Sequence, residues 1–215
     1  MALMLNCSED FKIPAGNIVA GKTVIFPTDT VYGLGTNPLS ADGVKRCYEI
    51  KRRYKGKKMP VLAADFDSAS KLVKFGTMSR SLAEIFWPGK LTIVLPAENP
   101  NLPEELVGRE RTLAVRVPNH QCCLGLISAC GGSLIGTSAN VSGEDPLTDP
   151  SSPKLRELSS LVDYFVSGSC GFASGISSTV IDATDEDSPR ILREGAIPKE
   201  EIFLHLEKIS KTDLS

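Results

Sequence analysis

Two threonines, an aspartate and a tyrosine lie together in PTDTVYGLG, residues 27–35, directly after the apolar run TVIF. Hydroxyl and carboxylate groups at the C-terminal end of a strand are well placed to bind a small polar ligand at the edge of a sheet. The same residue types are also typical of an ordinary turn, in which Asp29 and the threonines hydrogen-bond their own backbone. This stretch is therefore a candidate ligand site, and a structural turn is the alternative.

A second polar stretch, GTSANVSGEDPLT at residues 136–148, concentrates short hydroxyl and amide side chains where another strand-like run ends. Backbone amides and hydroxyls can form a neutral cradle for phosphate or carboxylate oxygens. We expect any such binding to occur without a P-loop. A purely structural turn remains the alternative here as well.

Positive charge is concentrated in KRCYEIKRRYKGKK, residues 45–58, although the formal net charge of the chain is only -2. A helix in this region would turn Val44, Cys47 and Tyr48 toward a core and leave its charges on a solvated face. That interpretation does not explain the cationic side chains that follow the helix. The phosphates of a nucleotide or of RNA are the alternative partner for this cluster, which comprises Lys51, Arg53, Lys55, Lys57 and Lys58.

Two arginines lie in strand-like runs, Arg116 in LAVRVP and Arg193 in RILREGAI. An arginine in a buried strand must find an anion or a carbonyl oxygen. A structural ion pair is the alternative to a ligand. Together with the polar stretches, these arginines suggest a site that holds an anionic small molecule by charge and hydrogen bonds.

The six cysteines form no C-x-x-C pair, and the two histidines are far apart in the sequence, so we expect no zinc site. The cluster HQCC, residues 120–123, could contain metal ligands or a reactive thiol. Because it opens an apolar helix-like run, we expect Cys122 and Cys123 to be buried and reduced.

Short apolar strand-like runs alternate with helix-like segments along the chain, which indicates an α/β fold. Several connections, notably from STVID to RIL, are too short for a crossover helix, so we expect a mixed sheet with parallel and antiparallel pairs. A length of 215 residues with 41% hydrophobic content suits one domain. The sequence shows neither a long apolar span nor a secretory signal, and we expect a cytoplasmic protein without membrane contact.

Seven motifs in order resemble the YrdC family of threonylcarbamoyl-AMP synthases. They are PTDTVYGLG, the K-x-R pair, FWPGKLTIVLP, LAVRVP, GTSANVSG, SSTVID and ILREGAI. The resemblance covers residues 9–202, which leaves residues 203–215 as the end of a helix and a tail. It implies an open, twisted α/β sheet of mixed direction, with flanking helices and a concave basic cavity. We expect a single domain of this kind, without the additional C-terminal domain that some members have.

The resemblance also implies an activity. Family members are nucleotidyltransferases that join L-threonine, bicarbonate and ATP into threonylcarbamoyl-adenylate and release pyrophosphate. The product serves the threonylcarbamoyladenosine modification of tRNA, which a separate transferase complex completes. Mg²⁺ is expected only as the companion of the triphosphate, with no metal site on the protein.

Site residues follow from the same resemblance. Threonine binding is implied for Thr30, Arg116, Ser138 and Ser178. Lys51 and Arg53 match the K-x-R pair, for which both ATP binding and a catalytic role are implied. The remaining ATP contacts implied are Lys57, Thr112, Asn140, Thr148 and Arg193. Three positions depart from the family pattern: Tyr54 replaces a usual proline, Leu62 replaces a histidine found in many members, and Lys90 stands where a second proline is common.

A module that binds double-stranded RNA or tRNA without catalysis is the alternative function. The lysine cluster supports it, while the acidic overall balance and the few aromatic residues near the cluster speak against it. In the enzyme, a contact with tRNA would be a secondary property.

Overall fold

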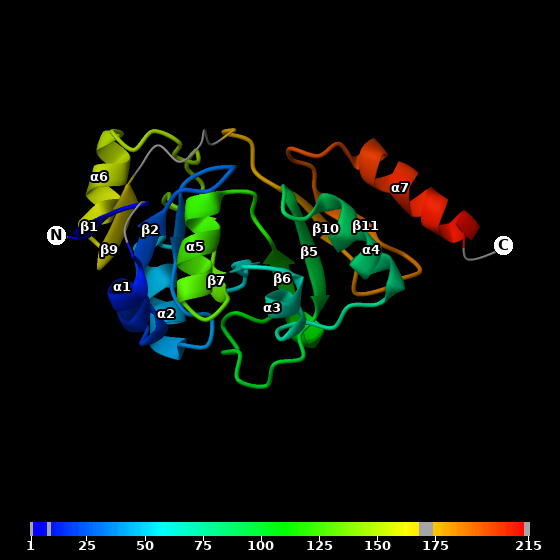
Figure 1. Cartoon of the computed structure of the whole chain (residues 1–215), viewed down its shortest axis with the longest axis horizontal. Helices are drawn as coiled ribbons and strands as arrows, with labels where there is room; N and C mark the ends of the chain where they lie inside the picture. The colour runs from blue at the N-terminus through cyan, green and yellow to red at the C-terminus, as the bar shows by residue number, and fades with distance from the viewer. Residues whose placement is uncertain (1, 8–9, 168–173, 213–215) are drawn as a thin grey trace.

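The computed structural model describes residues 2–7, 10–167 and 174–212. Two open sheets lie beside each other, with helices around them (Figure 1). The first sheet has the order β1-β9-β2-β3-β8, and its strands are Leu3–Asn6, Tyr164–Ser167, Val24–Phe26, Gly33–Gly35 and Thr137–Ser138. The second has the order β11-β10-β5-β6-β4-β7, with strands Arg190–Arg193, Thr179–Asp182, Leu91–Pro96, Thr112–Arg116, Val61–Ala63 and Ser133–Ile135.

Both sheets contain parallel and antiparallel pairs, which confirms the expected mixed α/β architecture. Strands β2 and β9 are parallel and β2 and β3 antiparallel, while in the other sheet β10 and β5 are parallel and β5 and β6 antiparallel. The run SLIGTS, residues 133–138, divides into β7 and β8, which belong to different sheets. This run therefore carries the chain from one sheet to the other.

The helices cover the outer faces and the middle of the molecule. In Figure 1, α1, α2 and α6 lie with the first sheet, α4 and α7 lie beside β5, β10 and β11, and α5 crosses the centre. Their bounds are Lys12–Val19 (α1), Ala41–Ile50 (α2), Phe66–Ser70 (α3), Thr77–Phe86 (α4), Gln121–Ala129 (α5), Pro153–Ser159 (α6) and Lys199–Thr212 (α7). Among the described residues, no helix is both long and apolar enough to cross a membrane.

Strand β2 separates two apolar cores because its side chains alternate between its faces. Val24 and Phe26 pack with residues of α1 and α5, whereas Ile25 belongs to the larger core that reaches α2, α4 and the second sheet. All three side chains are buried, as the run VIF predicts for a strand covered on both faces. This double burial fixes the loop that follows β2, which carries PTDTVYG.

The predicted domain limits at residues 9 and 202 remain predictions. Strand β1, which precedes residue 9, pairs in parallel with β9, and Leu5 is buried in the smaller core. The predicted boundary at residue 202 falls inside α7.

Candidate functional site

A cavity opens where the ends of strands from both sheets meet. Three arginines line it, together with six hydroxyl side chains and a few apolar and backbone groups. The lining comprises Arg53, Arg116 and Arg193; Thr30, Thr92, Thr137, Ser138, Ser177 and Ser178; and Val31, Pro60, Leu62 and Gly136. This composition suits an anionic ligand that is held by charge and by many short hydrogen bonds.

Arg116, the last residue of β6, is held rigidly at one side of the cavity. Its Nε donates to the carbonyl oxygen of Gly89 at 2.7 Å, and its NH2 donates to Oδ1 of Asp29 at 2.5 Å. Its NH1 donates to Oγ1 of Thr30 at 3.2 Å. These bonds use one N–H on each nitrogen, so each terminal nitrogen keeps a second donor. A guanidinium fixed in this way is prepared to bind a carboxylate.

The PTDTVYG loop works as a support for this arginine. Thr28 Oγ1 donates to the carbonyl oxygen of Val31 at 2.6 Å and lies 3.0 Å from Oγ1 of Thr30. Because the Thr28 hydrogen is directed to Val31, the Thr30 hydroxyl donates to Thr28 and accepts from Arg116. The loop is thus a hydrogen-bonded turn, and Thr30 and Val31 within it line the cavity.

The K-x-R pair owes its geometry to the end of α2. Arg53 N donates to Tyr48 O, and Arg52 N donates to Glu49 O, each at 3.0 Å, which is a Schellman motif. Arg52 occupies the left-handed region with a φ of 48°. This turn reverses the chain direction, so that Lys51 points into the protein and Arg53 reaches the cavity.

Lys51 is almost completely buried and lies against the TSAN stretch. Its Nζ donates to the carbonyl oxygens of Ser138 and Asn140 and, at 3.1 Å, to Oδ1 of Asn140. Burial, followed by the charge of Arg53, lowers the pKa of Lys51 to about 7. Lys51 thus braces the loop beside the cavity and does not line it.

Arg53 and Arg193 face the cavity from two different segments. Arg53 donates to the carbonyl oxygens of Lys57 and Lys58, and Arg193 donates to that of Ser178. Burial, together with the charge of a neighbouring arginine, lowers the pKa of both guanidinium groups. Since three like charges repel one another here, an anionic ligand would relieve that repulsion.

Hydroxyl and amide groups complete the wall. The Ser178 hydroxyl lies 2.8 Å from Oγ1 of Thr92, and the Ser138 hydroxyl donates to Oδ1 of Asn140 at 2.5 Å. Asn140 also donates to the carbonyl oxygen of Glu144 at 2.6 Å. Asn140 is therefore the residue that connects Lys51, Ser138 and the following turn.

Several predicted site residues meet at the cavity, and others do not. Thr30, Arg53, Arg116, Ser138, Ser178 and Arg193 line it, and Lys51 and Asn140 lie directly behind Ser138. Lys57 is exposed, Thr148 is exposed near Gly175, and Thr112 lies at the opposite end of β6 from Arg116. The roles assigned to these three residues remain predictions.

The sequence assigned no ligand-binding role to four residues that the structure places at the site, although Asp29 and Thr137 lie in polar stretches that it did single out. Thr92, Thr137 and Ser177 line the cavity, and Asp29 holds Arg116 from behind. Each lies next to or inside a motif already noted. Strand alternation could not have selected them, because the neighbours Thr137 and Ser138 both line the cavity and Asp29 and Ser177 lie outside the strands.

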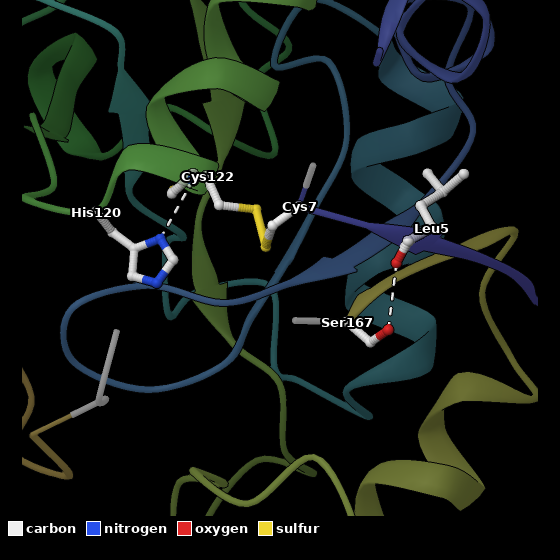
Figure 2. The surroundings of a disulfide bond; sticks show 6 residues. Leu5, Cys7, His120, Cys122 and Ser167 are labelled. Carbon is white, nitrogen blue, oxygen red and sulfur yellow. Dashed lines mark hydrogen bonds between the residues drawn. A yellow bond between two sulfur atoms is a disulfide. The ribbon is translucent and has the colours of Figure 1, made fainter. Parts of the chain in front are cut away.

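The HQCC cluster contains one half of a disulfide. Figure 2 shows a disulfide between Cys7, after β1, and Cys122, in the first turn of α5. The expectation of a reduced thiol is therefore wrong for Cys122, because β1 brings Cys7 alongside it from the far end of the sequence. The expectation of a buried, reduced thiol is confirmed for Cys123, which is free and buried. Cys170 lies outside the described residues. His120 caps α5 by accepting a hydrogen bond from Cys123 N.

One stretch fits the P-loop consensus G-x-x-x-x-G-K-[ST], namely GNIVAGKT at residues 16–23. It runs from the second half of α1 into β2, whereas a P-loop leads from a strand into a helix. Lys22 pairs with Asp163, and both the amide and the hydroxyl of Thr23 donate to the same carboxylate. The consensus is thus present in the sequence, but its residues form a structural turn.

The chain is similar to known proteins in sequence and in fold. The chain matches the family described as "Telomere recombination", which comprises Sua5, YciO and YrdC proteins, over residues 17–195. The threonylcarbamoyl-AMP synthase of Pyrococcus abyssi is 36% identical over 208 residues, which cover 94% of this chain and 60% of the relative. That of Bacillus subtilis is 35% identical over 185 residues, which cover 84% and 52%, so the chain spans about half to three fifths of these relatives.

A solved structure gives the same result. The structure of P. abyssi Sua5 complexed with L-threonine superimposes with a TM-score of 0.86 at 36% identity, covering 95% of this chain and 61% of that one. Because the sequence match extends over most of the chain and the fold agrees, the chain belongs to the Sua5, YciO and YrdC family.

Proposed function

We propose that this protein is a threonylcarbamoyl-AMP synthase, which joins L-threonine, bicarbonate and ATP into threonylcarbamoyl-adenylate and pyrophosphate. The observation that carries the proposal is the cavity in which Arg53, Arg116 and Arg193 converge among hydroxyl side chains. The substrates and product of this reaction carry a carboxylate, a triphosphate and an acyl phosphate. Family membership and the names of the relatives support the same reaction.

L-Threonine would bind on the Arg116 side. The second N–H on each terminal nitrogen of Arg116 would take the substrate carboxylate, since the first is held by Asp29 or Thr30. Ser138 and Ser178 would hydrogen-bond the polar groups of the amino acid. Leu62 and Val31 offer apolar contacts for its methyl group.

ATP would bind on the opposite side. Arg53 and Arg193 would contact the triphosphate, while Lys51 would hold the TSAN loop and add a positive charge behind it. Lys57, Thr112, Asn140 and Thr148 remain proposed contacts of the nucleotide. We infer that ATP enters as its magnesium complex, with Mg²⁺ held mainly by phosphate oxygens and water. No carboxylate lines the cavity, and no cluster of His, Cys, Asp and Glu that could hold a metal occurs in the described part of the chain.

The chemistry requires positioning and charge stabilisation more than a protein nucleophile. The threonine amine would attack bicarbonate carbon and lose water to give N-carboxythreonine. An oxygen of the new carboxylate would then attack the α-phosphorus of ATP in line, as the bond to the β-phosphate oxygen breaks and pyrophosphate leaves. Fixed guanidinium groups would offset the charge that develops on the phosphate oxygens, and the narrow cavity would align the two reactants.

Pyrophosphate release from ATP by the purified protein tests this function. We expect release only when threonine and bicarbonate are both present. Serine, which lacks the methyl group, should lower kcat/KM by roughly tenfold or more. Release that is equally fast without threonine would exclude the proposed reaction.

The adenylate would serve the threonylcarbamoyladenosine modification of tRNA, completed by a separate transferase complex in the cytoplasm. A contact with tRNA is a secondary proposal, favoured by exposed Arg52, Tyr54, Lys55 and Lys57 beside the cavity. Retention of tRNA that falls steeply with salt and weakens in Lys57→Ala would support this contact.

A further inference from the structure

Two buried polar atoms at the back of the Arg116 site are left unpaired. Among the side chains of the described residues, only Oδ2 of Asp29 and Nε2 of His120 are buried without a hydrogen-bond partner. Both residues are at least nine-tenths buried. Leaving a buried polar atom unpaired destabilises the folded protein, so two in one region call for a shared explanation.

The tautomer of His120 follows from its role as a helix cap. Nδ1 accepts a hydrogen bond from Cys123 N at 3.3 Å (Figure 2), and it can do so only without a proton of its own. In the neutral imidazole the proton must then lie on Nε2. The cap therefore leaves Nε2 as a donor, directed away from the first turn of α5.

Asp29 offers the matching acceptor. Its Oδ1 receives NH2 of Arg116, so Oδ2 is the oxygen that remains. Burial is the main influence on the pKa of both His120 and Cys123, and the Asp29 carboxylate has a smaller raising effect on each, which places it within electrostatic reach of the start of α5. The larger effect on His120 is burial, which lowers its pKa and keeps the ring neutral at pH 7.

We propose that His120 is a positioning residue for Arg116, acting through Asp29. Its Nε2–H donates to Oδ2 of Asp29 through one water molecule, since neither atom has a direct partner, while Oδ1 holds NH2 of Arg116. With each carboxylate oxygen engaged, Asp29 cannot rotate, and Arg116 keeps the orientation in which it receives the carboxylate of the ligand. The link joins helix α5 to the cavity although His120 is not part of the lining.

His120 therefore has two separable roles, and two substitutions divide them. His120→Asn keeps a capping oxygen near the position of Nδ1, and Asn is among the best helix caps, but it has no donor in the position of Nε2. His120→Gln can place an amide N–H near the position of Nε2 but loses the cap. A purely structural histidine would be replaced better by Asn, and a positioning histidine better by Gln.

The kinetic test rests on the proposed function. We expect His120→Asn to retain the melting temperature and the KM for ATP, while the KM for threonine rises by roughly tenfold. This is the size of effect found when a group that orients a ligand-binding residue is removed. His120→Gln should melt lower but bind threonine closer to wild type. In the double variant, the KM for threonine should be little higher than in Asp29→Asn alone, because His120 no longer acts on Arg116 once Asp29 is replaced. An unchanged KM in His120→Asn, or full additivity in the double variant, would overturn the proposal.

A second readout does not depend on catalysis. Nitrogen-15 NMR of the imidazole ring, assigned by difference from His120→Asn, should show a neutral ring with its proton on Nε2. Asp29→Asn should shift that Nε2–H signal, whether or not the protein is a synthase. A proton on Nδ1, or a signal that Asp29→Asn leaves unchanged, would contradict the link even in an active enzyme.

Discussion

Three arginines from distant parts of the sequence define the site at the scale of single residues. Valines around Arg116 indicated that it needs an anionic or carbonyl partner, and the structure supplies both Asp29 and Gly89. Whether that partner is a ligand or a structural ion pair could not be decided from the sequence, because Arg116 has enough donors for both. For Arg53, spacing alone predicted only a charge near the end of a helix.

The role of Arg53 can be measured directly. Arg53→Ala should lower kcat/KM for adenylate formation by about 100-fold, or roughly 3 kcal/mol of transition-state stabilisation, because a fixed cation is lost beside the reacting phosphates. Arg46→Ala is the matched control, since Arg46 lies exposed on α2 and contacts Glu49 and Leu161 O. Equal activity of the two variants would show that Arg53 has no such role.

Lys51 should make ATP binding depend on pH. Its pKa of about 7 in the free protein lies below the usual lysine value, so the side chain loses its charge as pH rises above 7. Phosphate oxygens would raise that pKa again, so ATP binding should take up protons. The Kd for ATP should therefore increase from about pH 7.5 to about pH 9, by at most tenfold per pH unit. Calorimetry in buffers of different ionisation enthalpy would detect the proton uptake, and none should occur in Lys51→Arg.

The end of α2 carries the site at the scale of secondary structure. The amphipathic pattern predicted the helix and its buried face correctly, with Val44, Cys47 and Tyr48 inside. The left-handed residue that ends it was not predictable, since Arg52 stands where glycine or asparagine is usual. Strand β3 was missed for a related reason: GLG has little intrinsic preference for a strand, and its pairing with β2 and β8 determines it.

Arg52→Gly should stabilise the protein. Glycine adopts a positive φ without the cost of about 1–2 kcal/mol that other residues incur. Part of this gain is offset, because glycine also increases the conformational entropy of the unfolded chain. The net increase in the free energy of unfolding should be about 0.5–1 kcal/mol by chemical denaturation. Lys45→Gly, an exposed substitution inside the same helix, should instead lower it by about 1 kcal/mol. Destabilisation in both variants would show that the turn does not strain Arg52.

The Cys7–Cys122 disulfide ties β1 to α5 over a sequence separation of 115 residues. Removing it by reduction should lower the free energy of unfolding by about 2–4 kcal/mol, because a long loop is no longer closed in the unfolded chain. Thermal unfolding with and without a thiol reductant measures the effect. The variant Cys7→Ser should melt at the same temperature with and without the reductant. If the reductant shifts the melting temperature of the wild type no more than that of this variant, the assignment of the disulfide is contradicted.

At the scale of the whole molecule, the cavity exists because two sheets place their strand ends together. Residues from position 30 to position 193 line it, and the passage from β7 to β8 through Gly136 joins the two sheets at its wall. A β-carbon on Gly136 would lie 2.2 Å from Cγ of Leu62, so the two segments meet closely there. Local patterns predicted most elements, but this convergence depends on long-range pairing that only the resemblance to a family could anticipate.

The most direct measurement of the central claim is the mass of the product. Purified protein would be incubated with magnesium-ATP, L-threonine and carbon-13 bicarbonate, and the nucleotides would be analysed by mass spectrometry. We predict threonylcarbamoyl-adenylate that carries the labelled carbon, formed together with pyrophosphate, and its loss when threonine is omitted. ATP consumed without a labelled threonine adduct would contradict the account and leave a nucleotide-binding protein with a different activity.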